Sequence, residues 1–156
     1  MELTDLQKMA GSHRAEFLDL KFADLLGMWH HITLPISSLT SDLFAHGVGV
    51  DGSSLPGFSS IVRGDMIMIP DPSTAFMDPF FDRPTLSMLG DIMESNDKIV
   101  PYSRNPRRVA ADAEAYLRKT MPNVECILGP EFEFYVFDKV NFFQGAESAF
   151  YHLDSV

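Results

Sequence analysis

The sequence has little cysteine and little positive charge. Cys126 is the only cysteine, so no disulfide can form within the chain, and a reduced, cytoplasmic setting is expected. The chain carries 12 Lys and Arg against 22 Asp and Glu, which gives a formal net charge of −10. Nucleic-acid backbones and anionic membrane surfaces are bound by clustered positive charge. We therefore expect no nucleic-acid partner and no membrane partner.

Long apolar runs and phosphate-binding loops are also missing. No stretch is apolar enough to cross a bilayer, and the start, MELTDLQKMAGSH, lacks the basic-then-apolar run of a signal peptide. There is no Gly-x-Gly-x-x-Gly run, and Gly47-Val48-Gly49 has no phosphate-loop lysine. What the chain does have is 46% hydrophobic residues and 13 Phe. That content predicts a packed core rather than a disordered segment.

Residue spacing predicts both helices and strands in the first hundred residues. Apolar residues at every second position indicate strands, and apolar residues three or four apart indicate helices. A run rich in glycine and proline, residues 47–64, is typical of exposed loops. The expected elements are helices over 4–10 and 38–45, a hairpin of strands over 17–22 and 28–34, and strands over 66–69 and 85–93.

A polar link near residues 100–106 predicts a domain boundary. Asn105 can cap a helix, Pro106 suits its first turn, and Pro122 prevents it from continuing. Two strands should follow, over 124–128 and 131–137, with Cys126 inert inside the first. The expected organisation is an N-terminal helix over 1–12, a first domain over 13–103, and the start of a second domain over 104–156.

Glu131 and Glu133 form the sharpest local pattern. Side chains alternate along a strand, so both carboxylates should share one face, beside further aromatic residues. Paired carboxylates in partly buried surroundings either take up a proton or bind a cation, and oxygen ligands favour Mg²⁺ or Mn²⁺. The pattern alone, however, favours a simpler interpretation, a strand whose outer face is polar.

A second pattern is the loop Asp51-Gly52-Ser53-Ser54. These residues are typical of a turn in which the aspartate side chain bonds to the backbone two residues further on. The functional alternative is that Asp51 is an exposed carboxylate that holds a cation or accepts a proton. His30 and His31, adjacent on an expected strand, should face opposite ways and serve packing.

Five motifs, in this order and spacing, resemble the glutamine synthetases of the bacterial and archaeal type. The similarity extends from about residue 17 to about residue 138. The motifs are Asp51-Gly52-Ser53-Ser54, the run from Gly64 to Asp71 (GDMIMIPD), Asp78-Pro79-Phe80, Arg104-Asn105-Pro106-Arg107, and Gly129-Pro130-Glu131-Phe132-Glu133-Phe134.

The resemblance implies an α+β fold, a β-grasp N-terminal domain followed by the first part of a glutamine-synthetase-like catalytic domain. It also implies a reaction in which ATP phosphorylates the γ-carboxylate of L-glutamate and ammonia attacks the acyl phosphate to give glutamine. Two divalent ions, Mg²⁺ or Mn²⁺, would organise the phosphates. The enzyme would be a ring-shaped homo-oligomer with active sites between its subunits.

Four residues match functional positions of the family. Glu131 and Glu133 match its two metal-binding glutamates, one for each ion. Asp51 matches the loop aspartate that draws in ammonium and helps to remove its proton, in the active site of a neighbouring subunit. Ser54 matches a loop serine close to that aspartate and is a candidate substrate-binding residue.

Some positions depart from the usual family pattern. Gly64 replaces a serine, Arg63 an acid, Asn105 an aspartate and Gly90 a cysteine. None of these changes touches a candidate site residue. The remaining metal ligands, the ATP pocket and the arginines for glutamate lie further along in the family.

Three interpretations of the function therefore stay open. The chain is part of a glutamine synthetase that is inactive by itself, part of a relative that joins glutamate to another amine, or a non-catalytic assembly or interaction module.

Overall fold

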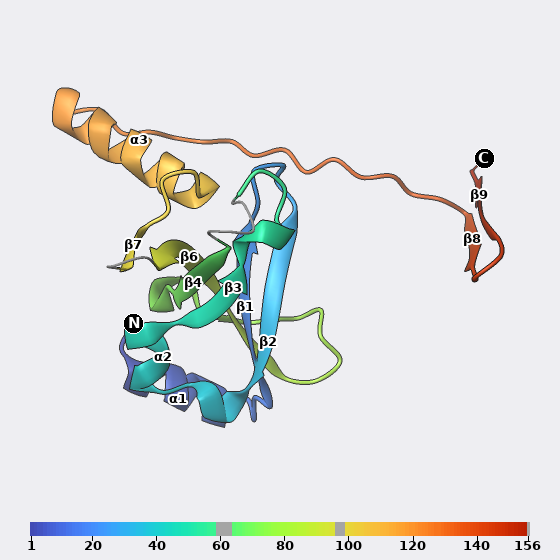
Figure 1. Cartoon of the computed structure of the whole chain (residues 1–156), viewed down its shortest axis with the longest axis horizontal. Coiled ribbons are helices and arrows are strands. Elements are labelled where there is room, and N and C mark those ends of the chain that lie inside the picture. The colour runs from blue at the N-terminus through green and yellow to red at the C-terminus, as the bar shows by residue number, and fades with distance from the viewer. Residues whose placement is uncertain (59–63, 96–98, 156) are drawn as a thin grey trace. The chain divides into compact units, whose positions relative to one another are not determined.

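The computed structural model describes residues 1–58, 64–95 and 99–155. Contacts between residues divide the chain into two compact units, Met1–Val124 and Glu125–Val156, and each is considered by itself. Figure 1 follows the chain from the first unit, whose described residues form a mixed sheet and three α-helices, to the short second unit.

The first unit begins with a helix and a hairpin, as the spacing predicted. Helix α1 (Leu3–Ser12) buries Leu6 and Ala10, the apolar stripe that made it recognisable. Strands β1 (Phe17–Ala23) and β2 (Trp29–Pro35) pair antiparallel, with Leu20 opposite Ile32. The predicted boundaries of these three elements are confirmed to within two residues.

The next segment contains a strand that the sequence did not predict. Helix α2 (Ser41–His46) follows a 3-10 turn, η1 (Ile36–Ser38), and ends at Gly47, whose φ of 70° suits glycine. Strand β3 (Val48–Asp51) pairs antiparallel with β4 (Asp65–Pro70). The expectation of loops throughout 47–64 is thus wrong for β3, because Gly49 between two β-branched valines still pairs when a neighbouring strand is available. Residues 59–63 of that expectation lie outside the described part of the chain.

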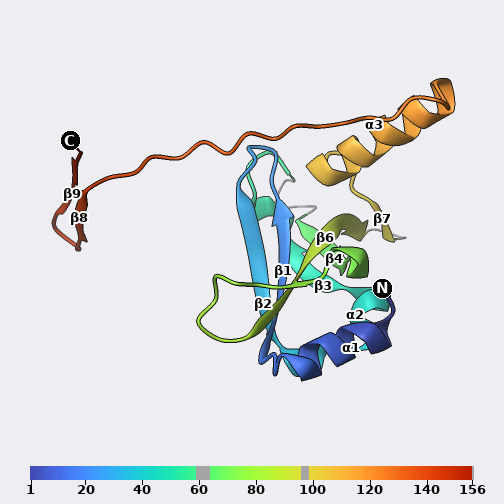
Figure 2. The same ribbon diagram turned by 180° about the vertical axis from the view of Figure 1, so that it is seen from behind.

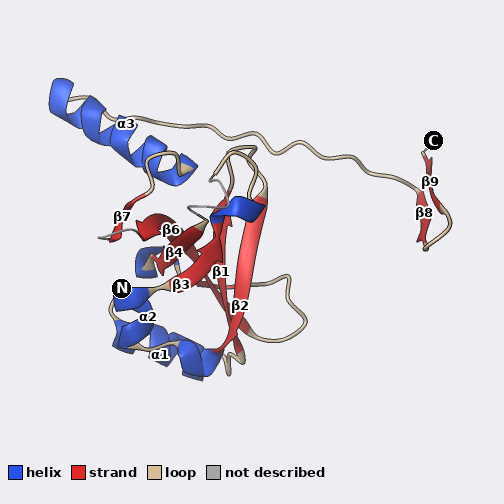
Figure 3. Ribbon diagram, viewed as in Figure 1, coloured by secondary structure: helices blue, strands red, loops and turns tan. Residues whose placement is uncertain are grey.

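Strand β6 (Thr85–Ser95) is the centre of the sheet. Its first half pairs in parallel with β1 and antiparallel with the short β5 (Phe76–Met77). Its second half pairs antiparallel with β4 and with β7 (Ile99–Pro101). The resulting order is β2-β1-β6-β4-β3, and Figure 3 shows these strands together in red.

The core of this unit lies between the sheet and the helices. Figure 2, like Figure 1, shows α1 and α2 side by side at one end of the strands. Leu6 of α1 and Leu43 of α2 are buried in one cluster with apolar side chains of β1, β4 and β6. The fully buried members from these strands are Leu18, Leu20, Met68, Leu86, Met88 and Ile92. Burial of such side chains contributes about 1.5–3 kcal/mol each.

Helix α3 (Pro106–Thr120) completes the unit. Asn105 caps it as predicted, because its side-chain oxygen accepts a hydrogen bond from the backbone N–H of Arg107 at 3.3 Å. The Arg107 guanidinium pairs with Asp71 and, at 2.9 Å, with Asp91. These contacts tie the start of the helix to the residue after β4 and to the middle of β6.

Two predictions for the segment after α3 are wrong. Residues 124–128 and 131–137, expected as strands, have no regular structure, because no described strand pairs with them and a strand needs partners for its backbone groups. Cys126, expected inside an apolar strand, is exposed. The second unit does contain an unpredicted antiparallel hairpin of β8 (Lys139–Gln144) and β9 (Ala149–Asp154).

Candidate functional site

Asp51 is the last residue of β3, and its carboxylate is held by the turn that follows. In the 3-10 turn η2 (Gly52–Ser54), the backbone N–H of Ser53 donates to Asp51 Oδ1 at 2.9 Å. The Ser53 hydroxyl donates to the same oxygen at 2.6 Å, and the Ser54 hydroxyl donates to Oδ2 at 2.6 Å. Both carboxylate oxygens are thereby fixed, while the residue itself stays exposed.

Buried residues anchor this loop on the C-terminal side of Asp51. Gly52 is buried, and its N–H donates to the carbonyl of Gly64 at 2.7 Å. Just beyond the turn, Leu55 and Phe58 are buried in the core cluster. The Phe58 carbonyl accepts hydrogen bonds from the hydroxyl of Tyr102 and from Arg104. The exposed Asp51 therefore lies at the start of a loop that buried residues and hydrogen bonds anchor to the first unit.

The hydrogen bonds also set the charge of Asp51. The hydroxyls of Ser53 and then Ser54, with the Ser53 backbone N–H, favour the ionised form and lower the pKa of Asp51 below its usual value. At neutral pH the residue is thus a carboxylate, open to solvent on a fixed loop. Such a group attracts a small cation and can act as a proton acceptor.

The structure brings together two of the four predicted site residues. Ser54 lies in direct hydrogen-bond contact with Asp51, so its hydroxyl serves at least to orient that carboxylate. Ser53, which sequence reasoning did not single out, makes two hydrogen bonds to Asp51. The sequence pattern could have indicated Ser53 as a partner of Asp51, because the side chain of an aspartate that opens a turn bonds to the residue two positions later.

Glu131 and Glu133 belong to the second unit and lie on its irregular segment. Both are exposed, as are Phe132 (89%) and Phe134 (79%) between and after them. Oxygen donors of this kind suit Mg²⁺ or Mn²⁺, but such ions take about six ligands. Among the described residues, no three His, Cys, Asp or Glu side chains are grouped closely enough to hold a metal. Carboxylate oxygens are the ligands that a hard cation prefers, but the described residues supply too few of them to complete its coordination shell.

Comparison with known proteins identifies the family. The glutamine synthetase β-grasp domain matches residues 14–95. The glutamine synthetase of Mycobacterium tuberculosis is 40% identical over 152 residues, which are 97% of this chain and 32% of that protein. The glutamine synthetase of Aquifex aeolicus is 40% identical over 156 residues, 99% of this chain and 32% of that protein. The chain spans about a third of the length of these relatives.

The solved structures agree at the level of the fold. Plasmodium falciparum glutamine synthetase superposes with a TM-score of 0.72 at 16% identity, over 99% of this chain and 30% of that one. In the part of the chain that the structure describes, every helix is too short or too polar to cross a membrane. The predicted β-grasp architecture is confirmed, and the matches continue past it toward the end of the chain. This chain belongs to the glutamine synthetase family and contains its β-grasp domain.

Proposed function

We propose that this chain is the N-terminal part of an ATP-dependent ligase that joins ammonia to L-glutamate. The observation that carries the proposal is the fixed, ionised and exposed carboxylate of Asp51 on the loop after β3. A carboxylate presented in this way suits the capture of ammonium, which is a small cation. Membership of the glutamine synthetase family supports the choice of reaction.

In the proposed reaction, the γ-carboxylate of glutamate attacks the terminal phosphorus of ATP, and γ-glutamyl phosphate and ADP are formed. Asp51 binds ammonium and accepts one of its protons. The nitrogen lone pair of the resulting ammonia then attacks the acyl carbon, the bond from that carbon to the phosphate oxygen breaks, and the extra proton on the nitrogen passes to the departing phosphate or to solvent. General-base help of this kind contributes about 10²–10⁴-fold to a rate.

The remaining parts of the site are proposals as well. Glu131 and Glu133 would each supply one carboxylate to Mg²⁺ or Mn²⁺, whose positive charge would neutralise the phosphates of ATP. Ligands beyond the described residues must complete both metal sites. The Asp51 loop would act in the active site of a neighbouring subunit of a homo-oligomer. The domain boundary at 103/104 and the cytoplasmic location stay predictions from the sequence.

The test compares two proteins in assays with ATP, L-glutamate, ammonium and Mg²⁺. One is the protein from its natural source, whose mass establishes the length of its chain, and the other is the chain of residues 1–156. We expect glutamine from a natural protein longer than this chain and none from residues 1–156, because two carboxylates cannot complete two metal sites. Glutamine formation by residues 1–156 alone would contradict the proposal. Methylamine in place of ammonium distinguishes a relative that uses another amine.

Asp51→Asn in the active protein tests the carboxylate itself. We expect turnover to fall about 10²–10⁴-fold and the ammonium concentration for half-maximal rate to rise, with nucleotide affinity nearly unchanged. Asp42→Asn is the matched control, because Asp42 is an exposed aspartate on α2. If Asp51→Asn leaves the ammonium dependence as it was, the loop is only a turn.

A further inference from the structure

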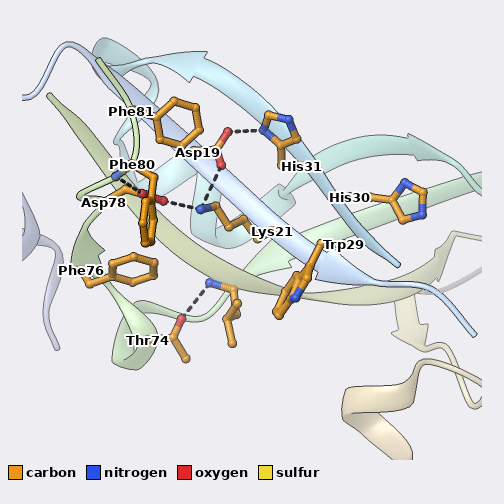
Figure 4. Close-up of a pocket in the computed structure, with 11 residues that line it drawn as sticks. Asp19, Lys21, Trp29, His30, His31, Thr74, Phe76, Asp78, Phe80 and Phe81 are labelled. Atoms are coloured by element: carbon orange, nitrogen blue, oxygen red, sulfur yellow. Dashed lines mark hydrogen bonds and ion pairs between the residues drawn. The ribbon is translucent and has the colours of Figure 1, made fainter. Parts of the chain in front are cut away.

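The hairpin of β1 and β2 is fixed by contacts inside the first unit. Beside it lies a cavity of about 750 Å³ whose carboxylates face Lys21, which pairs with Asp78 and lies 3.8 Å from Asp19 Oδ2 (Figure 4). His31 Nδ1 of β2 lies 2.7 Å from Asp19 Oδ1 of β1. These contacts join the two strands to each other and to the loop after β5, so the hairpin is a firm neighbour for other segments.

Near its turn, this hairpin contacts the end of the Asp51 loop, residues 51–58. The ring centres of Phe22 and Phe58 lie 6.5 Å apart, and the Phe22 ring is itself stacked on His30 with centres 5.3 Å apart. A Cβ added at Gly57 would lie 2.9 Å from Leu25 Cδ1. The loop therefore lies directly against the hairpin, with little room to shift toward it.

Tyr102, just after β7, contacts Phe58 through both its ring and its hydroxyl. The two ring centres lie 5.1 Å apart, and the hydroxyl donates to the Phe58 carbonyl. Arg104 donates to the same carbonyl at 2.5 Å. Tyr102 is only 3% exposed, and its backbone N–H donates to the carbonyl of Ile92 at 3.0 Å. Phe58 is thereby fixed to β6, the central strand of the sheet.

Backbone hydrogen bonds connect Phe58 to the turn that holds Asp51. The Phe58 N–H donates to the Leu55 carbonyl at 3.1 Å, and the Leu55 N–H donates to the Gly52 carbonyl at 3.3 Å. Gly52 directly follows Asp51, and the hydroxyl of Ser54, within this stretch, donates to the Asp51 carboxylate. A displacement of Phe58 would therefore disturb the turn that orients this carboxylate.

We propose that Tyr102 and Arg104 are positioning residues for Asp51. Both act through the Phe58 carbonyl, which fixes the end of the loop, rather than on the carboxylate itself. The inference rests on the ammonium-binding function proposed for Asp51. If only molecules with the loop in place bind ammonium well, the apparent affinity falls in proportion to that fraction. The segment between β7 and α3 thus sets how well the ammonium site is formed.

Hydrogen exchange in the chain of residues 1–156 tests the positioning without an assay of activity. Tyr102→Phe keeps the ring and removes one donor to the Phe58 carbonyl, and a double variant with Arg104→Ala removes both. We expect amides of 50–58 to exchange about fivefold faster or more in the double variant, and less so in Tyr102→Phe. Amides of 17–22, in β1, should exchange as in wild type.

Two results of the exchange experiment would overturn the proposal. One is an unchanged rate for 50–58 in the double variant. The other is an equal acceleration of 50–58 and 17–22, which would mean that the substitutions only reduce the stability of the whole unit. Circular dichroism checks that the double variant folds, and Tyr102→Phe decides the question if it does not.

Kinetics of the active protein test the consequence for the reaction. In Tyr102→Phe the ammonium concentration for half-maximal rate should rise about two- to tenfold, with the ATP concentration for half-maximal rate unchanged. Tyr116→Phe is the matched control, because Tyr116 on α3 is 69% exposed, and it should behave as wild type. A purely structural role of Tyr102 would lower the maximal rate and leave the ammonium dependence as it was. That result would overturn the proposal.

Asp51→Asn, assayed in parallel, separates this inference from the proposed function. If Asp51→Asn changes the ammonium dependence and the double variant of Tyr102 and Arg104 does not, the positioning role is wrong and the proposed function stands. If Asp51→Asn leaves the ammonium dependence unchanged, the proposed function is wrong and the positioning role for ammonium fails with it.

Discussion

At the scale of single residues, the carboxylates of Asp51 and Asp78 obtain their hydrogen bonds in two different ways. Asp51 is exposed and receives its hydrogen bonds from Ser53 and Ser54 of its own loop. Asp78 is buried and is held from three directions, by Lys21, by the Ser87 hydroxyl at 2.9 Å, and by the backbone N–H of Phe80 at 3.0 Å. Asp51 is thus available to a ligand, whereas Asp78 links β1, β6 and the loop after β5.

The buried Asp78 should make stability depend on acid pH. Burial alone would raise the pKa of Asp78, but the hydrogen bonds from Lys21, Phe80 and Ser87 outweigh it and lower that pKa below its unfolded value of about 3.9. Its contribution to stability is therefore complete above about pH 4 and is lost as the pH falls through the lowered pKa. We expect Asp78→Asn to reduce the free energy of unfolding at pH 7 by about 1–3 kcal/mol.

Urea unfolding from pH 7 to pH 2 measures this effect. The difference between wild type and Asp78→Asn should shrink below about pH 4. Asp82→Asn is the control, because Asp82 is an exposed neighbour in the same loop and should change stability by about 0.5 kcal/mol or less. A constant difference at every pH would show that the charge of Asp78 is not what stabilises the fold.

The carboxylates of Glu131 and Glu133 can be tested as metal ligands in the active protein. Each substitution, Glu131→Gln and Glu133→Gln, removes one charged donor, so the Mg²⁺ or Mn²⁺ concentration needed for half-maximal activity should rise about tenfold or more. The two effects need not be equal, because each residue is proposed to serve a different ion. Glu125→Gln, an exposed glutamate of the same unit, should change little. Metal titrations identical to wild type for both variants would leave these glutamates as surface residues.

At the scale of elements, β6 changes its neighbours along its length. Up to Leu89 it pairs with β1, and from Gly90 it pairs with β4. A Cβ added at Gly90 would lie 2.3 Å from Cγ and 2.6 Å from Sδ of Met68, which is fully buried. The absence of a side chain at Gly90 therefore lets Met68 of β4 fill the core at this point.

Gly90→Ala should consequently destabilise the sheet. Overpacking of a core costs about 1–3 kcal/mol, measured here as the free energy of unfolding in urea. Met68→Ala should cost about 2–5 kcal/mol through the cavity it leaves. In the double variant the new methyl group occupies part of that cavity. The decrease in the free energy of unfolding should therefore be smaller than the sum of the decreases in the two single variants. Strictly additive losses would mean that Gly90 and Met68 do not compete for the same space.

At the scale of the whole molecule, the two units differ in how much surface they bury. The first unit contains the entire buried core of the described residues. In the second unit, aromatic residues of the irregular segment and of the hairpin are largely exposed, among them Phe132, Phe134, Tyr135, Phe142 and Tyr151. Apolar surface of this kind is typical of segments that pack against a partner.

Hydrogen exchange should separate the two units in the chain of residues 1–156. Amides of β1 and β6 pair inside the sheet and should exchange slowly, whereas amides of 125–137 have no described strand partner and should exchange at nearly the rate of an unfolded peptide. Mass spectrometry of peptides over 17–22, 85–93 and 125–137 makes the comparison. Strong protection of 125–137 would show that this segment does find partners within the chain.

The sequence by itself determined the local elements and the family. Alternation of apolar residues located β1, β2 and β6, the Asn105-Pro106 pair located the start of α3, and the ordered motifs indicated the glutamine synthetase family before any comparison. Such features depend on neighbours in the chain, so they can be recognised without tertiary contacts. The Asp51-Gly52-Ser53-Ser54 turn belongs to the same class, because the hydrogen bonds that described residues donate to its carboxylate are local.

The tertiary structure decided what depends on partners distant in sequence. Whether 131–137 forms a strand depends on a neighbouring strand, and none is present among the described residues, although the alternation of its residues is strong. The pairing of β3 and the cavity around Asp19 also arise from contacts between distant segments. Backbone hydrogen bonds and burial are satisfied by whichever segments meet in space, and a sequence pattern specifies only one side of each such contact.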